Sequence, residues 1–295
     1  MDMALLKAVS RSFYLSMVWL PPAMRRGIAL GYMLARATDS VADTSTAAAG
    51  DRVEVLRRMG QAVAGELAEP ELAELLRLLR DEMADRQEKP AEATLLRRFG
   101  ECLALLRQVS GEERRLIRKV LAIIVEGQLW DLTYFAGRTA VESDDETHRY
   151  TYMVAGCVGE FWTELGLATM GAGFCNPERR EIMVQAGIRY GRGLQLVNIL
   201  RDMAEDAARG RAYLCSDPVL WQGRAARYLN DGLDYARRLG SFRLRFTAML
   251  PALLGIKTLR LIAQRAGVER VKISRLAVYA SLLNAAWLSV WRRAS

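Results

Sequence analysis

Residues 191–214 read GRGLQLVNILRDMAEDAARGRAYL, and their pattern is that of a helix. At about 100° per residue, several polar side chains fall on one stripe of this helix. They are Gln195, Asn198, Asp202 and Asp206. The stripe is flanked by apolar positions, which are Leu194, Leu196, Val197, Ile199 and Leu200. Because polar groups within an apolar helix indicate a face that looks into a lined cavity, we predict a long helix with its carboxylates at a cavity wall.

Residues 31–44, GYMLARATDSVADT, repeat this arrangement with a stripe of Tyr32, Arg36, Asp39 and Asp43. In both stretches two aspartates stand four residues apart, which on a helix places like charges on one face at a cost of roughly a few tenths of a kcal/mol. A cation between the carboxylates reverses the sign of this interaction, and oxygen ligands suit Mg²⁺. One such pair is common on solvated helices, but two pairs on apolar helices predict a metal site.

The composition favours an all-α fold. Hydrophobic residues make up 51% of the 295 residues, which allows a large core, and only 7 prolines are present to interrupt helices. No hairpin signal, βαβ alternation or long linker is visible, so we predict a single helical domain over residues 1–295. Helices are expected over residues 2–14, 22–43, 51–66, 71–86, 91–109, 112–136, 150–173 and 177–209, with two or three more after Pro218.

The formal net charge of +8 fits nucleic acid, an anionic membrane surface or phosphate-bearing substrates. No basic run with interleaved aromatic residues is present, so we expect no nucleic-acid partner. The four cysteines form no CxxC pair, and the clusters typical of zinc or iron are absent. Isolated cysteines suit a reducing cytoplasm; they are Cys102, Cys157, Cys175 and Cys215.

The two ends of the sequence predict a cytoplasmic protein without a membrane-spanning helix. Residues 1–13 lack the pattern of a signal peptide. The uncharged run Leu276–Val290 is shorter than the roughly 20 residues that span a bilayer, and it contains Ser281, Asn284 and Ser289. We therefore expect a buried terminal helix there.

Several elements, in order along the chain, resemble the squalene/phytoene synthase family. They are SRSF at 10–13, RATDSVAD at 36–43, YTYMVAGCVG at 150–159, QLVNILRDMAED at 195–206, GRAYL at 210–214 and VKISR at 271–275. In one departure, Ala42 stands where many members have Glu, which bears on the affinity or number of Mg²⁺ ions. The resemblance implies an isoprenoid-synthase-type helical bundle around a central cavity.

The resemblance also implies a role for each matching residue. A Mg²⁺ cluster that bridges the diphosphates would be held by Asp39, Asp43, Asp202 and Asp206. Diphosphate oxygens would be neutralised by Arg11, Arg36 and Arg201. Tyr150 would lie beside the departing diphosphate or the migrating proton. Substrate contacts would come from Ser10, Arg11, Phe13, Tyr32, Gln195 and Asn198, and the prenyl channel would be shaped by Val154, Ala155 and Gly159.

The family resemblance implies a Mg²⁺-dependent prenyltransferase. We expect head-to-head condensation of two farnesyl diphosphates through presqualene diphosphate to squalene, with reduction by NADPH, because YTYMVAGCVG looks closer to squalene-forming members. The alternatives are a dehydrosqualene or phytoene synthase, or an enzyme that stops at presqualene diphosphate. A non-catalytic assembly factor is an alternative of another class, although such relatives tend to lose the aspartates. The apolar product and the basic chain predict peripheral association with the inner membrane face.

Overall fold

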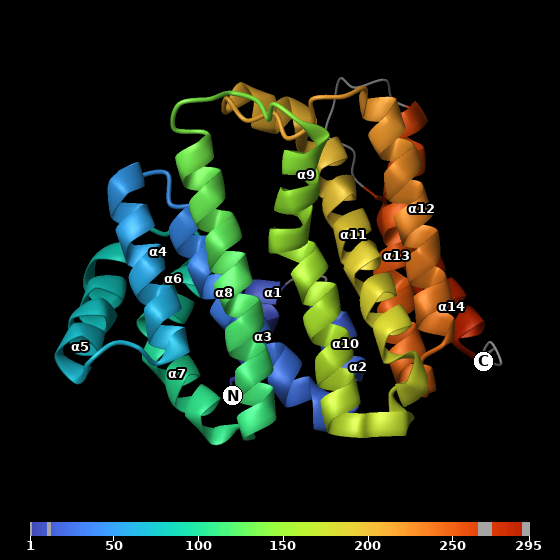
Figure 1. Cartoon of the computed structure of the whole chain (residues 1–295), viewed down its shortest axis with the longest axis horizontal. Helices are drawn as coiled ribbons and strands as arrows, with labels where there is room; N and C mark the ends of the chain where they lie inside the picture. Colours follow the sequence, from blue (N-terminus) through green and yellow to red (C-terminus); the bar gives the residue numbers. More distant parts are fainter. Residues whose placement is uncertain (1, 11–12, 265–272, 291–295) are drawn as a thin grey trace. The chain divides into compact units, whose positions relative to one another are not determined.

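The computed structural model describes residues 2–10, 13–264 and 273–290, and Figure 1 shows that its regular elements are helices. Within these ranges no strand is present, and one isolated bridge joins Ala140 to Ala212. The prediction of an all-α fold is confirmed.

The chain divides into two compact units. Unit 1 comprises Met1–Met17 and Met24–Ala136, and unit 2 comprises Val18–Ala23 and Gly137–Ser295. The expectation of one domain over residues 1–295 therefore stays a prediction, and so does the expectation of a central cavity.

Unit 1 carries the first aspartate pair at the end of its helix α3, with Asp39 on the helix and Asp43 directly after its last residue. The helix begins at Pro22, since proline is tolerated in a first turn, and it buries Leu34 and Val41 completely. Asp39 on its other side stays partly accessible. The elements of this unit are α1 (Met3–Ser10), α3 (Pro22–Ala42), α4 (Ala49–Ala64), α5 (Glu69–Leu78) with its π-helical extension η1 (Leu79–Met83), α6 (Pro90–Arg97), α7 (Phe99–Gln108) and α8 (Gly111–Tyr134); α2 (Phe13–Trp19) crosses into unit 2.

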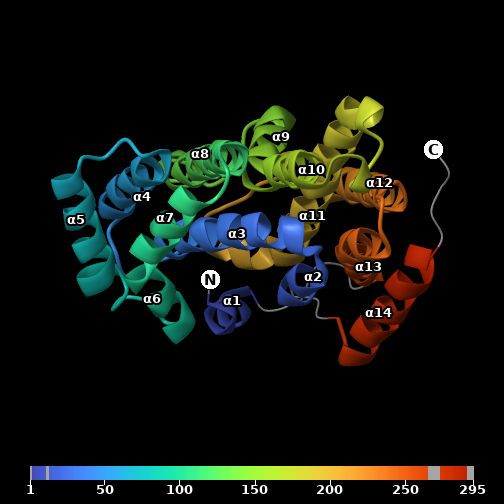
Figure 2. The ribbon, with the colours of Figure 1, turned by 90° about the horizontal axis from the view of Figure 1, so that it is seen from below.

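Unit 2 is arranged around the long helix α11, which packs against α10, α12 and α13 (Figure 2). The polar stripe predicted from residues 191–214 lies on α11. The elements are α9 (Asp144–Thr151), the π-helical turn η2 (Tyr152–Gly156), α10 (Cys157–Met170), the short turns η3 (Gly171–Gly173) and η4 (Pro177–Arg179), α11 (Arg180–Ala208), α12 (Pro218–Arg237), α13 (Phe242–Gln264) and α14 (Arg275–Val290).

Glycines bring α11 into backbone contact with η2 and α10. A Cβ atom placed on Gly159 would lie 1.9 Å from the carbonyl oxygen of Gly187, and one on Gly191 would lie 2.2 Å from that of Ala155. No side chain fits at either place, so these positions need glycine. The crossing holds the YTYMVAGCVG segment against the helix of the second aspartate pair.

Two predicted helix boundaries are wrong. The helix expected over 91–109 is divided at Arg98. The stretch expected as a helix over residues 2–14 contains α1 and the start of α2, and residues 11–12 between them lie outside the described part. The helix expected from residue 150 begins at Asp144, because the Ser143 side chain and Glu146 form a capping box. That Ser-x-x-Glu signal was present in the sequence.

The end of unit 2 differs from prediction in two respects. Helix α13 is long and apolar enough to cross a membrane, by length and composition only, and half of the qualifying window is buried inside the fold. Helix α14 is not a buried terminal helix: its buried residues are small, and its large apolar side chains are exposed. Sequence hydrophobicity indicated burial, but α14 contacts its neighbour α13 through its small residues.

Candidate active site

The first aspartate pair lies on the half-buried side of α3, where an arginine links two carboxylates. Arg36 donates through Nη1 to Asp39 and through Nη2 to Glu92 of α6. Glu92, which is only 7% exposed, also accepts from Lys89 Nζ at 3.0 Å. The Arg36 Nε is buried and lacks a hydrogen-bond partner within the described part of the chain. Asp43, one turn further along, is exposed.

Burial and neighbouring charges shift the pKa values of Asp39 and Glu92 in opposite directions. Burial and the charge of Asp43 raise the pKa of Asp39 to about 7, although Arg36 acts in the opposite direction. Burial also acts to raise the pKa of Glu92, but hydrogen bonds from Lys89 and Arg36 outweigh it and hold that pKa below its usual value. An added cation would therefore favour the charged form of Asp39.

The second aspartate pair lies on α11. Arg201 binds the neighbouring Asp202 with two hydrogen bonds, from Nε to Oδ1 at 3.0 Å and from Nη2 to Oδ2 at 2.5 Å. The Asp202 side chain is 18% exposed. Asn198 on the same stripe is exposed, and its Nδ2 lies 3.4 Å from Gln195 Oε1. Two members of the stripe predicted from the sequence, Gln195 and Asn198, thus lie within hydrogen-bonding distance of each other.

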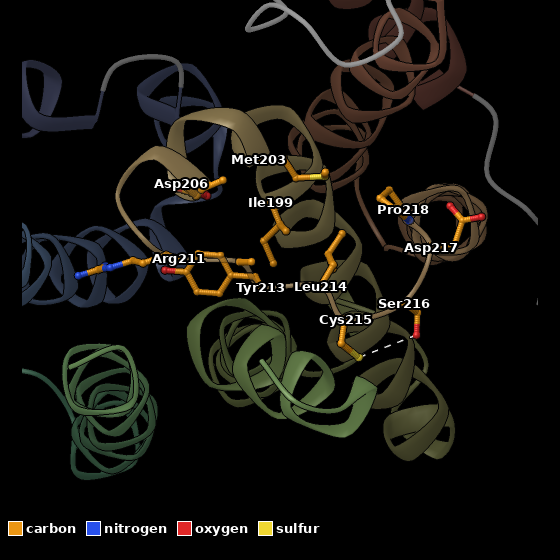
Figure 3. Close-up of a pocket in the computed structure, with 12 residues that line it drawn as sticks. Ile199, Met203, Asp206, Arg211, Tyr213, Leu214, Cys215, Ser216, Asp217 and Pro218 are labelled. Carbon is orange, nitrogen blue, oxygen red and sulfur yellow. Dashed lines mark hydrogen bonds between the residues drawn. The ribbon is translucent and has the colours of Figure 1, made fainter. Parts of the chain in front are cut away.

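Asp206 opens onto a pocket of about 390 Å³ formed by the last turns of α11 and the segment that follows (Figure 3). Ile199 and Leu214 contribute apolar walls, and Arg211 contributes a positive charge. The full lining is Ile199, Met203, Asp206, Ala207, Arg211, Ala212, Tyr213, Leu214, Cys215, Ser216, Asp217 and Pro218.

Tyr150 is held beside this pocket. Its ring stacks on that of the pocket-lining Tyr213, with the centroids 4.7 Å apart and the planes 14° from parallel. Thr147, one turn before Tyr150, donates its hydroxyl to the Tyr213 carbonyl at 2.7 Å. Tyr150 thus contacts Tyr213, which lines the same pocket as Asp206.

The YTYMVAGCVG segment contains polar groups that the sequence reading missed. The Tyr152 hydroxyl donates to Glu160 Oε2 at 2.8 Å, and burial together with Glu160 raises the pKa of this phenol to about 12. Arg192 of α11 lies over the Tyr152 ring at 5.4 Å. The η2 turn produces this arrangement, and π-helical turns are frequent at functional sites. The only indication in the sequence was that Tyr152 lies within the YTYMVAGCVG motif.

The small residues of this segment have an observed packing role. Gly159 and Ala155 touch the backbone of α11, so the space that their small side chains leave is occupied by protein. Contacts of Val154, Ala155 and Gly159 with substrate stay predictions.

The remaining predicted residues are placed as follows. Ser10 donates its hydroxyl to the Leu6 carbonyl at 2.5 Å, and Tyr32 donates to the Val9 carbonyl at 3.2 Å. Arg11, the Phe13 side chain, Val271 and Lys272 lie outside the described part. Among the residues that the structure describes, no group of three or more His, Cys, Asp or Glu could by itself hold a metal ion. The two aspartate pairs lie in different units, so their convergence stays a prediction.

Comparison with known proteins places the chain in a known family. The family model described as squalene/phytoene synthase matches residues 6–219. The chloroplastic phytoene synthase 1 of Zea mays is 32% identical over 163 residues, which cover 54% of this chain and 35% of that protein. The squalene synthase of Eremothecium gossypii is 27% identical over 214 residues, which cover 71% and 44%. The chain spans less than half the length of these relatives.

Solved structures show the same fold. The complex of TcSQS with the ligand BPH1237 matches with a TM-score of 0.75 at 18% identity, over 98% of this chain and 86% of that one. A dehydrosqualene synthase in complex with a ligand matches with a TM-score of 0.66 at 17% identity, over 98% and 95%. At such identities the likeness concerns the fold alone. Because the family model matches well over half of the sequence, the chain belongs to the squalene/phytoene synthase family.

Proposed function

We propose that the protein is a Mg²⁺-dependent prenyltransferase that condenses two farnesyl diphosphates head to head. One observation carries this proposal: two aspartates four residues apart lie on α11, and two more lie at the end of α3, with Asp43 directly after its last residue, and in each pair an arginine is bound to the first aspartate. Repeated like-charge pairs bring no stability on their own. They suit a reaction in which two diphosphate groups must be held and one or both must leave.

The residues present fit a divalent cation. The raised pKa of Asp39 reports repulsion and desolvation that a nearby cation relieves. The proposed ligands are Asp39, Asp43, Asp202 and Asp206, with Asn198 assisting. When bound, Mg²⁺ would stabilise the negative charge on the diphosphate oxygens and so favour departure of the diphosphate group. Glu92 lies near the first pair, where Ala42 replaces the Glu of many relatives, but it is bonded to Arg36 and Lys89.

Arginine side chains of the protein add to the electrostatic stabilisation that the metal would supply. Arg36 and Arg201 are held in place by carboxylates, and a guanidinium fork matches phosphate oxygens as well as carboxylate oxygens. Fixed cations of this kind stabilise the charge that develops on a leaving diphosphate. Arg11 is proposed for the same role from its sequence position.

Tyr150 and the pocket at Asp206 suit the reacting end of a substrate. Stacking on Tyr213 fixes the Tyr150 ring, so its hydroxyl can orient a departing diphosphate or receive a migrating proton. Apolar walls such as Ile199 and Leu214 exclude water from a carbocation. No protein nucleophile is required for this chemistry.

We propose squalene as the product, which requires a hydride from NADPH. The described side chains do not single out a nicotinamide site, so no residue is assigned to NADPH. Dehydrosqualene, phytoene and presqualene diphosphate are the alternative products, and relatives with phytoene synthase and squalene synthase names both match the chain.

A product assay tests the proposal. Purified protein is incubated with farnesyl or geranylgeranyl diphosphate and Mg²⁺, with and without NADPH, and the extracts are separated by mass. We expect squalene only when NADPH is present, and no turnover after chelation of the metal. Formation of dehydrosqualene, phytoene or presqualene diphosphate instead would change the proposed product and leave the proposed site unchanged. No turnover of either substrate would contradict catalysis and favour an assembly factor of the same fold.

A further inference from the structure

Three basic side chains gather where α9 and α12 pack beside α11 in unit 2 (Figure 1). They are His148 of α9, Arg192 of α11 and Arg224 of α12, and each is half-buried. Within the described part of the chain, neither arginine forms an ion pair with a carboxylate. Arg189, one turn before Arg192, differs in this respect, since it pairs with Asp231 of α12 at 2.9 Å. The two guanidinium charges of the cluster are therefore not neutralised by an ion pair.

Arg224 contacts the histidine ring directly. Its Nη1 donates to His148 Nε2, and its guanidinium lies 4.6 Å over the ring of Trp221. The same Trp221 ring packs against the His148 ring, with the centroids 5.1 Å apart. A guanidinium has no acceptor atom, so Nε2 must accept, and the imidazole is neutral with its proton on Nδ1. A protonated His148 would lose this hydrogen bond and face a like charge.

The surroundings disfavour a positive charge on His148. Burial and the charges of Arg224 and Arg192 lower the pKa of the imidazole, whereas Asp144 and Asp145 of the same helix act in the opposite direction. The carboxylate of Asp144 already accepts two hydrogen bonds from side chains of the segment after α11. The nearby acids therefore do not cancel the positive charge of the cluster.

Two buried donors at this cluster lack an acceptor. Arg192 Nε and Trp221 Nε1 are buried without a hydrogen-bond partner in the described part of the chain. Arg192 lies over the ring of Tyr152 at 5.4 Å, but the Glu160 carboxylate beside it is bonded to the Tyr152 hydroxyl instead. Unsatisfied donors and unpaired positive charges both indicate that an anionic acceptor belongs here.

We propose that His148, Arg192 and Arg224 form a binding site for a doubly charged oxyanion, namely the phosphate group of a small soluble ligand. A tetrahedral oxyanion offers acceptors to both guanidinium groups, whose forks match phosphate oxygens. Its charge offsets the repulsion among the three bases. On binding, His148 takes up one proton from solvent at Nε2 and donates to the anion in place of accepting from Arg224. The inference rests on these contacts and not on the proposed catalysis.

Nuclear magnetic resonance of the imidazole tests the site, because His148 is the only histidine in the sequence. The pKa of His148 is measured on protein without a histidine tag, in sodium chloride and in sodium sulfate of equal ionic strength, with no metal or prenyl substrate. Sulfate stays doubly charged throughout the titration. We expect sulfate to raise the pKa of His148 by about 1 or more, and inorganic phosphate to act in the same direction.

The variants are Arg192→Gln and Arg224→Gln, on two different helices. In chloride each should raise the pKa of His148, because a positive charge beside the imidazole is removed. The sulfate concentration for half of the response should rise by about tenfold or more in each. The matched control is Arg189→Gln, whose arginine is already paired with Asp231, and it should respond like wild type. Thermal unfolding checks that each variant folds.

An equal pKa of His148 in chloride and in sulfate would overturn the proposal, as would a sulfate response that both arginine variants retain. A response to phosphatidic acid vesicles without one to soluble phosphate would overturn the assignment to a soluble ligand. Because no prenyl substrate is present, these outcomes are independent of the product assay.

Discussion

At the scale of single residues, Glu92 is the part of the site that the sequence could not disclose. It lies about fifty positions from the first aspartate motif and belongs to no motif, yet it binds the arginine of that motif. Because Arg36 divides its hydrogen bonds between Glu92 and Asp39, Glu92 limits how strongly Arg36 neutralises Asp39. Only a contact between α6 and α3 reveals this.

Substitution Glu92→Gln should therefore weaken the use of Mg²⁺. Without the Glu92 charge, Arg36 pairs more fully with Asp39, and the Mg²⁺ concentration for half-maximal activity should rise several-fold. Loss of a charged hydrogen bond should also lower the free energy of unfolding by roughly 1.5–3 kcal/mol. Titration of activity with Mg²⁺ measures the first effect, and urea unfolding the second.

The matched control is Glu101→Gln, which breaks the Arg98–Glu101 pair on a more exposed surface of the same unit. This pair should contribute about 0–1 kcal/mol, and the Mg²⁺ dependence should not change. An unchanged Mg²⁺ requirement in Glu92→Gln would show that Arg36 does not compete with the cation for Asp39.

At the scale of elements, periodicity predicted most helices, and local chemistry decided their ends. The helices expected to carry the two aspartate stripes were found as α3 and α11, because both stretches have a clear 3.6-residue period. The division at Arg98 and the η2 turn depend on packing that a single sequence does not encode locally. The exposed face of α14 could not be read either, since leucine-rich helices on a core and on a surface have the same composition.

The crossing of α10 and α11 gives a test at this scale. In Gly159→Ala the new methyl group would meet a backbone oxygen that cannot move aside, so the two helices must separate. Overpacking of this kind costs about 1–3 kcal/mol, and the melting temperature should fall accordingly.

Gly223→Ala on α12 is the control for this substitution, because nothing lies within 4 Å of its added Cβ. Alanine is the better helix former there, so this variant should be as stable as wild type or more stable by up to about 1 kcal/mol. Equal stability of the Gly159 variant and wild type would mean that α10 and α11 are not in backbone contact.

At the scale of the whole molecule, the question is whether the two aspartate pairs act on one substrate complex. Their pairing was inferred from sequence by analogy of pattern, and each unit by itself shows one pair with its arginine. If the two aspartate pairs are independent sites, substitutions in both pairs should combine differently than if the pairs share one Mg²⁺–diphosphate cluster. Residues that act as a unit in catalysis are strongly non-additive, whereas independent sites add.

We therefore expect Asp39→Asn and Asp202→Asn each to lower kcat/KM by roughly 10²–10³-fold, and the double variant to be hardly worse than either. The control is Asp81→Asn, which breaks an Arg80–Asp81 pair between neighbouring residues, like Arg201–Asp202 but exposed. Its small effect should simply add to that of Asp39→Asn. If the two catalytic substitutions instead multiplied their losses, each pair would have to bind its own ligand separately. A single metal cluster drawn from both units would then be excluded, while the role of each pair would stand.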